Sequence, residues 1–363
     1  MVRMLPSIWQ IALAMAALCA APGSVGNARG GLPEPPVTDE LVIYERGNMP
    51  VIVLAPHDGK RKPEGMPLRK RGIRDVSTSK LARRLCSELA YTDANGVQRR
   101  PHLVINLASR AVVDPNMSWE RNVRAGWFDV GGKRVDPPAR AKRIHGDFHA
   151  CAAYAVKSVE ASHGAGVLLD LHGMSAKRSV DMYGYLLRGR ELSAKEDGNH
   201  PTPDTALAKA IRARSTMRHA ASRKKTDSEV ASLVRGPQSL ASLVDQAYSK
   251  LYPALTNAAG QPRGRPATPS ARFPSPKESS TPDHDLVYFN GSYDIFAHSS
   301  RQQGVRVDAV QIETLPDARN TRTQRSRFAT CMATALREFL RLHYDLDIAS
   351  PAKPAPGAAA PPP

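Results

Sequence analysis

Two histidines and a glutamate each stand at the end of a short apolar run. His57 follows Val-Ile-Val-Leu-Ala-Pro, His172 ends Val-Leu-Leu-Asp-Leu-His, and Glu313 ends Val-Gln-Ile-Glu. Such runs are typical of buried β-strands, and open α/β sheets carry their chemistry at strand ends. Two neutral imidazoles and a carboxylate form a catalytic zinc site when a fourth position stays open for water. The pattern therefore predicts a metal site that activates water for attack on a carbonyl group.

Each of these signals has a simpler interpretation when taken alone. A histidine after a proline is more often a loop residue, and Asp170-Leu171-His172-Gly173 also suits a buried hydrogen-bonded pair. Glu313 alone would more often be a salt-bridge partner. The joint occurrence of the three at strand ends is what favours a site.

The elements that position these residues follow from the hydrophobic pattern. We predict strands at residues 41–45, 50–54, 102–107, 167–171 and 305–312, and helices at residues 79–91, 138–162 and 325–343. In the middle of the chain, the pattern predicts a strand at 183–187, a short helix at 206–214 and a helical run that begins within 235–240 and ends at Tyr252. Strands that alternate with helices predict an α/β fold, in which helices cover the faces of a sheet.

The two ends of the chain read differently from its centre. Residues 1–28 predict a secretory signal peptide, with Arg3 before an apolar stretch and small residues after it, although an uncleaved anchor or a transit peptide remains an alternative. Residues 29–39 form a linker, and residues 40–346 form one domain with an irregular insertion at 257–285. Residues 347–363 are Pro/Ala-rich and predict a disordered tail. We therefore expect a secreted or extracytoplasmic protein that is not membrane-bound after signal removal.

The charge of the chain bears on its partners. The 363 residues carry a formal net charge of +17, which favours anionic partners or reflects a general surface bias. Basic residues are spread over many segments, aromatic residues make up 6%, and no recognition motif occurs, so we expect no specific nucleic-acid binding. The basic loop at residues 60–74 beside His57 would instead steer a small anionic substrate. Cys86, Cys151 and Cys331 lie in helical patterns and suit buried side chains, with one disulfide as the alternative.

A set of short motifs gives the chain a family resemblance. They are Pro56-His57-Asp58-Gly59, Lys62-Pro63-Glu64-Gly65-Met66-Pro67, Asp75, Ser79-Lys80-Leu81-Ala82, Val104-Ile105-Asn106, Ser109-Arg110, Val113-Asp114-Pro115-Asn116, Leu169-Asp170-Leu171-His172-Gly173, Gly236-Pro237-Gln238-Ser239-Leu240, Tyr288-Phe289-Asn290-Gly291-Ser292-Tyr293 and Val310-Gln311-Ile312-Glu313. In this order and spacing the chain resembles the N-formylglutamate amidohydrolase family, itself similar to zinc carboxypeptidases and aspartoacylases. The resemblance covers roughly residues 51–340.

The resemblance implies a fold, an activity and a metal site. The fold is a three-layer α/β/α arrangement around a mixed, mostly parallel sheet, as in the zinc carboxypeptidases. The activity is hydrolysis of the amide of an N-acyl, N-formyl-type amino acid or a similar small acidic compound, with one zinc ion. The implied ligands are His57, Glu64 and His172, with Asp75 in place of Glu64 as the alternative, because the His57-to-Glu64 gap is wider than the His-x-x-Glu of carboxypeptidases. Glu313 matches the general base.

The substrate side of the resemblance is less complete. Arg110 is implied as a catalytic and substrate-binding residue, and Asn116, Ser239 and Tyr293 as further substrate-binding residues. The family pattern Asp-x-Asn-Arg is broken here, because Met117 follows Asn116. Arg121 or Arg124 could supply the missing guanidinium. Without such a replacement, the chain would be a weak or inactive binding protein on the same fold.

Overall fold

The structure is a computed structural model that describes residue 35 and residues 37–70, 72–174, 181–192, 203–253 and 289–348. These residues all belong to one compact unit. The predicted signal peptide, the predicted insertion at 257–285 and nearly all of the predicted tail lie outside them.

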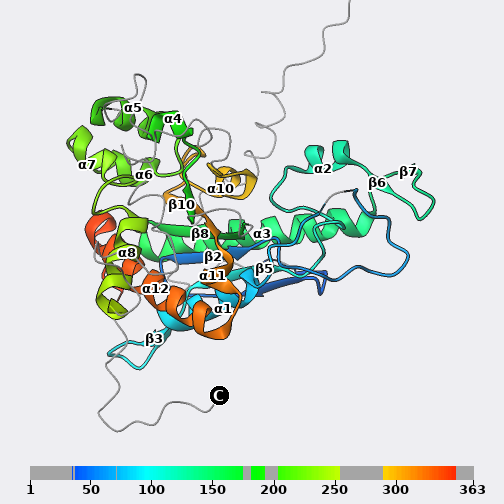
Figure 1. The fold of residues 1–363 in the computed structure, drawn as a ribbon, viewed down its shortest axis with the longest axis horizontal. Coiled ribbons are helices and arrows are strands. Elements are labelled where there is room, and N and C mark those ends of the chain that lie inside the picture. Colours follow the sequence, from blue (N-terminus) through cyan, green and yellow to red (C-terminus); the bar gives the residue numbers. More distant parts are fainter. Residues whose placement is uncertain are drawn as a thin grey trace, which may run out of the picture. The chain divides into compact units, whose positions relative to one another are not determined.

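A six-stranded sheet forms the centre of this unit (Figure 1). Its four central strands are mutually parallel, and the strand at each edge is antiparallel to its neighbour. The prediction of an α/β fold with a mixed, mostly parallel sheet is therefore confirmed. In spatial order the strands are β1 (Val42–Glu45), β5 (His102–Asn106), β2 (Val51–Ala55), β8 (Gly166–Gly173), β10 (Val307–Thr314) and β9 (Met182–Gly184).

Helices cover both faces of the sheet, as the buried side chains of β2 show. Val53 and its alternate neighbours pack into one apolar cluster, whereas Ile52 and Leu54 pack into another. Successive side chains of a strand point to opposite faces, so the two clusters are the two cores of a three-layer arrangement. The first core contains α1 (Thr78–Leu89), α8 (Leu240–Leu251) and α12 (Arg322–Tyr344), and the second contains α3 (Ala139–His163).

Shorter elements complete the described unit. Two small hairpins, β3 (Tyr91–Thr92) with β4 (Gln98–Arg99) and β6 (Trp127–Phe128) with β7 (Arg134–Val135), stand apart from the main sheet. The short helices are α2 (Trp119–Ala125), α4 (Gly189–Leu192), α5 (Asp204–Arg214), α6 (Arg218–Ser222), α7 (Asp227–Ala231), α10 (Tyr293–Ala297) and α11 (Pro316–Arg319).

The face of the sheet toward α3 becomes polar where the parallel strands end. On β8 this face carries Leu168, then Asp170 and His172, while the opposite face stays apolar. On β10 the same face carries Gln311 and Glu313, and Glu313 lies directly opposite His172 in the parallel register. The fold thus gathers the predicted chemistry at one end of one face.

The two largest differences between predicted and observed element boundaries, among the described residues, concern the strand predicted at 183–187 and the last helix. The predicted strand at 183–187 is shorter and ends at Gly184. The last helix begins at Arg322 rather than 325, because Thr321 and Gln324 form a capping box that supplies partners for its first backbone N–H groups.

Two further properties concern the described residues alone. Among them, no helix is long and apolar enough to cross a membrane. Cys86, Cys151 and Cys331 form no disulfide within the described residues, and the last two are buried.

Candidate metal centre

His57, Asp75 and His172 converge at the polar end of the sheet. His57 follows β2, His172 lies on β8, and Asp75 ends the long loop before α1. The Nδ1 atoms of His57 and His172 lie 3.3 and 3.1 Å from the same Oδ2 atom of Asp75. Within the described residues, these three side chains form the one group that could hold a metal ion, with ligand atoms within 4.8 Å of one another.

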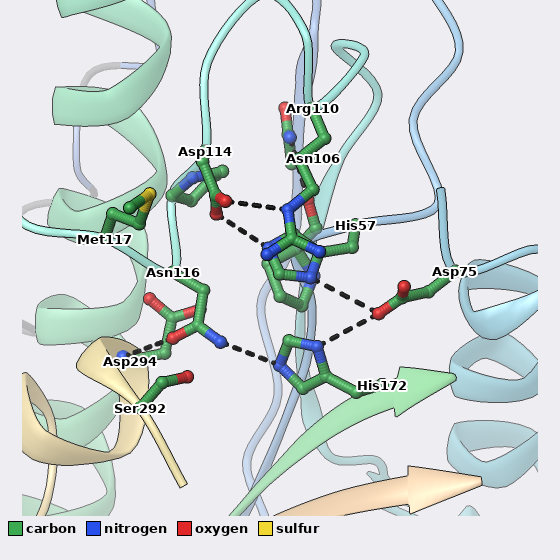
Figure 2. A network of polar contacts seen from close by, with 12 residues as sticks. His57, Asp75, Asn106, Arg110, Asp114, Asn116, Met117, His172, Ser292 and Asp294 are labelled. Atoms are coloured by element: carbon green, nitrogen blue, oxygen red, sulfur yellow. Dashed lines mark hydrogen bonds and ion pairs between the residues drawn. The ribbon is translucent and has the colours of Figure 1, made fainter. Parts of the chain in front are cut away.

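Carboxylates also lie behind both imidazoles. His57 Nε2 is 2.7 Å from Asp114 Oδ1, and His172 Nε2 is 2.9 Å from Asp170 Oδ2. Figure 2 shows Asp75 on one side of the imidazole pair and Asp114 on the other. Metal-binding histidines use their second ring nitrogen in this way, because the carboxylate fixes the tautomer and the ring orientation.

The donor set suits a cation between the three side chains. When His57 donates Nε2–H to Asp114, its Nδ1 lone pair faces an oxygen of Asp75, which is repulsive unless a proton or a metal ion lies between them. His57, Asp75 and His172 are only 2, 6 and 2% exposed, so bulk water does not screen this repulsion. Two imidazoles and a carboxylate are a standard ligand set for zinc. The residues present therefore fit the metal ion that the resemblance implies.

The charges around the site act in the same direction. Burial opposes protonation of both imidazoles, yet Asp114 and Asp75 raise the pKa of His57, and Asp170 and Asp75 raise the pKa of His172 well above its usual value. Burial likewise opposes ionisation of Asp75, but hydrogen bonds from the two histidines hold its pKa far below the usual range. The surrounding carboxylates therefore favour a positive charge at the imidazole pair, whether carried by protons or by a metal ion.

Glu313 lies beside the imidazoles and outside the metal-binding group. Its side chain is 7% exposed, and Gln311 Nε2 donates to its Oε1 atom at 2.9 Å. Ser292 Oγ donates to the Oε1 atom of Gln311 at 2.8 Å, which fixes the orientation of the amide. Burial raises the pKa of Glu313, which makes its carboxylate a stronger base.

The loop at residues 59–75 is held against the segment after β5. Backbone hydrogen bonds join Ser109 N to Arg61 O at 2.8 Å and Arg69 N to Ala111 O at 2.7 Å. A Cβ atom on Gly59 would lie 2.1 Å from the carbonyl oxygen of Ala108, so only glycine permits this approach. The loop then returns, and Asp75 N donates to His57 O at 3.1 Å. This path brings Asp75 to the two histidines.

The same path decides which of the two candidate carboxylates lies near the histidines. Glu64 lies on the outer part of the loop with its side chain exposed to solvent, and it is not part of the metal-binding group. Asp75, the alternative expected from the sequence, is the candidate carboxylate that lies within reach of both histidines.

Arg110 and Asn116 both lie near the candidate metal centre, but their side chains make different contacts. Arg110 Nε donates to Asp114 Oδ2 at 2.7 Å, and its partly exposed side chain lines a pocket. Asn116 has both ends of its amide occupied: Oδ1 accepts from Asp294 N at 2.9 Å, and Nδ2 lies 3.1 Å from His172 Nε2. That nitrogen of His172 is thus flanked by Asp170 and Asn116. When this nitrogen donates its hydrogen to Asp170, it has no lone pair for the Asn116 amide, so Asn116 contacts His172 while its own carbonyl oxygen is held by Asp294 N.

The two remaining predicted substrate-binding residues make other contacts. Ser239 is fully buried, and its hydroxyl donates to Gly236 O at 2.8 Å within the turn that begins α8. Tyr293 packs edge-to-face on His149, with ring centroids 5.3 Å apart. Within the described residues, neither side chain forms a hydrogen bond to the metal-binding group.

A pocket of about 870 Å³ opens beside Asp114. Its lining includes three cationic side chains, Arg69, Lys70 and Arg110, together with Met117 and Ile73. The volume suits a small molecule. Sequence reasoning noted the basic loop but missed Arg69, since nothing in the pattern Leu-Arg-Lys-Arg distinguishes a buried arginine from an exposed one.

Comparisons with known proteins give limited information. No protein-family model matches the chain, and no curated protein matches it. N-formylglutamate amidohydrolase from Ralstonia eutropha JMP134 is 14% identical with a TM-score of 0.46, covering 84% of this chain and 99% of that one. A gene product from Agrobacterium tumefaciens is 14% identical with a TM-score of 0.43, covering 83% and 95%. At these values the likeness assigns neither an activity nor a site residue to this chain.

Proposed function

We propose that the protein is a zinc-dependent amidohydrolase that cleaves the amide of an N-acyl amino acid or a similar small anionic compound. One observation carries the proposal: the Nδ1 atoms of two buried histidines meet one carboxylate oxygen of Asp75, while carboxylates hold their Nε2 atoms. The family resemblance of the sequence motifs supports the same activity.

The residues divide into those that would bind the metal ion and those that orient the imidazole rings of its ligands. His57, Asp75 and His172 would hold the ion, while Asp114 and Asp170 fix the imidazoles from behind. The nitrogen and oxygen ligands favour zinc over calcium or magnesium. A zinc ion bound there supplies a Lewis acid and lowers the pKa of water.

Glu313 moves the proton in the proposed reaction. Its carboxylate accepts a proton from the attacking water and returns it to the leaving nitrogen of the amide. The raised pKa of Glu313 suits both steps, since the group must accept a proton and then release it. Gln311 keeps the carboxylate in place throughout, because it donates to Oε1.

The test measures metal content and turnover together. Protein purified without chelators should contain close to one equivalent of zinc and hydrolyse members of a panel of N-formyl and N-acetyl amino acids. His172→Ala should lose the metal and the activity, whereas Glu313→Gln should keep the metal and lose about 10²- to 10⁴-fold in kcat. The control is His163→Ala, at the C-terminal end of α3, which should keep both the metal and the activity. Full turnover in either site variant would contradict the proposal.

A binding protein without catalysis is the second candidate function. Met117 favours it, because this side chain lines the pocket where the family pattern has an arginine. The same measurements separate the two candidates. Folded protein that holds little or no zinc and hydrolyses no member of the panel supports the second candidate.

A further inference from the structure

Arg69 is a buried arginine with unused hydrogen-bond donors beside the candidate metal centre. Arg69 is 9% exposed and lines the pocket next to Asp114. Within the described part of the chain, its Nε and Nη1 atoms have no hydrogen-bond partner. Burying guanidinium donors without partners is costly, so such a group in a pocket indicates a ligand that supplies the missing acceptors.

The neighbours of Arg69 do not satisfy it. Its Nη2 atom donates to the sulfur of Met117 at 3.2 Å, and a thioether is only a weak acceptor. Its Nη1 atom lies 3.9 Å from Asp114 Oδ2, beyond hydrogen-bonding distance. Asp114 already accepts from His57 through Oδ1 and from Arg110 through Oδ2. No carboxylate among these neighbours is left over for Arg69.

The arrangement also compensates for the break in the family motif. Met117 stands where an arginine would follow Asn116, and the guanidinium of Arg69 reaches the sulfur of that same methionine. Arg121 and Arg124, the two substitutes expected from the sequence, point to solvent from α2 and do not line the pocket. A guanidinium from a different part of the chain thus occupies the neighbourhood of the missing one.

We infer that Arg69, together with Arg110, forms a carboxylate-binding subsite that selects substrates of the metal centre by their free carboxylate. Both guanidinium groups approach the Oδ2 atom of Asp114, while His57 contacts Oδ1, so the subsite adjoins the metal-binding group through Asp114. Met117 and Ile73 add apolar surface for the rest of the ligand. The inference rests on the proposed function for the identity of the anion, since N-acyl amino acids carry a carboxylate.

The first experiment measures binding without turnover. Zinc-loaded protein with Glu313→Gln is titrated by calorimetry with N-acetyl-L-leucine and with N-acetyl-L-leucinamide, which differ in the carboxylate alone. The carboxylate should bind about 10- to 100-fold more tightly, as expected for hydrogen bonds to a charged group. Adding Arg69→Met should remove most of this difference, with Arg110 accounting for the remainder, and Arg69→Lys should restore part of it, since lysine keeps the charge without the planar fork.

The control variant removes an arginine outside the pocket. Arg84→Met, which breaks an exposed pair with Glu88 on α1, has the same effect on net charge and should keep the full preference. Unfolding temperatures of all variants show whether the protein is folded. An unchanged preference in the Arg69→Met protein, or no binding of either compound at millimolar concentration by folded protein, would overturn the inference.

Turnover assays separate this inference from the proposed function. If neither compound is hydrolysed by the protein with Glu313 intact, yet binding still depends on Arg69, the proposed function fails and the subsite stands. If the N-acetyl compounds are hydrolysed and Arg69→Met lowers kcat/KM equally for carboxylate and carboxamide, the function stands and the subsite fails.

Discussion

Asp75 is the residue on which the candidate centre depends most directly. One of its oxygen atoms faces Nδ1 of both histidines, and its side chain is almost fully buried. Removing its charge would leave the Nδ1 atoms of the two imidazoles facing each other without an anionic partner between them. Their ring centroids are only 4.6 Å apart, so a cation between them would lose its neutralising ligand.

We expect Asp75→Asn to weaken zinc binding by more than about 100-fold, because replacing groups that merely support a ligand costs 10- to 100-fold. Glu64→Gln is the matched control, since Glu64 lies on the same loop, loses the same charge and is exposed. Zinc affinity is measured by competition with a chelator of known affinity. If Glu64→Gln weakened zinc binding more than Asp75→Asn, Glu64 would be the carboxylate ligand instead.

The sequence predicted the histidines better than the carboxylate. His57 follows β2 and His172 lies near the end of β8, and parallel strands bring their ends together, so position along the chain was enough to predict that the two histidines lie close together. Asp75 lies 18 residues after His57 on an irregular loop whose path depends on backbone contacts with distant residues. Arg69 was missed for the same reason, because its burial is decided by that path.

At the scale of elements, the loop at residues 59–75 matters as much as any strand. Its described residues contain no helix or main-sheet strand, yet they include both Asp75 and Arg69. Its course is fixed by hydrogen bonds to the segment after β5 and by two close approaches at glycines. Gly59 meets Ala108, and a Cβ atom on Gly72 would lie 2.5 Å from the backbone nitrogen of Ala111.

Gly59→Ala should therefore displace the loop and weaken zinc binding while it lowers stability by about 1–3 kcal/mol, the usual cost of overpacking. Gly146→Ala is the control: it lies inside α3, a Cβ atom there meets nothing within 4 Å, and alanine favours the helix by about 0.5–1 kcal/mol. Urea unfolding and chelator competition measure the two effects. Equal zinc affinity in both variants would show that the loop adapts.

Regular elements were predicted well where they carry a long apolar pattern. The central strands and the helices α1, α3 and α12 repeat their buried residues over several turns or alternations. The hairpins β3–β4 and β6–β7 have strands of two residues each, which are too short to show any periodicity. The helix α2 depends on Ser118, whose side chain accepts from Arg121 N, and a single cap is a weak signal without a following apolar stripe.

At the scale of the whole molecule, several buried histidines tie stability to pH. His343 on α12 is 2% exposed, and its Nε2 atom lies 3.0 Å from Gln238 O, which it can meet as a neutral donor. Burial lowers the pKa of His343 to about 4. Because this value lies below that of an unfolded histidine, near 6.5, the unfolded chain binds a proton that the folded protein excludes. The contribution of neutral His343 to the free energy of unfolding is fully present above pH 6.5 and is lost as pH falls toward 4.

His343→Gln should make the unfolding free energy less sensitive to pH in this window, since glutamine can still donate to Gln238 and does not titrate. The difference between variant and wild type should amount to about 3 kcal/mol, at about 1.4 kcal/mol per pKa unit. Urea denaturation at pH 7, 5.5 and 4 measures it. Parallel curves for the two proteins would mean that His343 binds its proton in the folded state as readily as in the unfolded chain.

The loop that delivers both Asp75 and Arg69 has a consequence for how the two ligands act on each other. A metal ion that binds Asp75 holds one end of this loop, and an anion that binds Arg69 holds its middle. Whichever arrives first restricts the conformations of the shared segment, so the second loses less entropy on binding. Thermodynamic reciprocity then requires that each ligand raise the affinity of the other by the same factor. Zinc and substrate would thus be cooperative ligands joined by one short stretch of backbone.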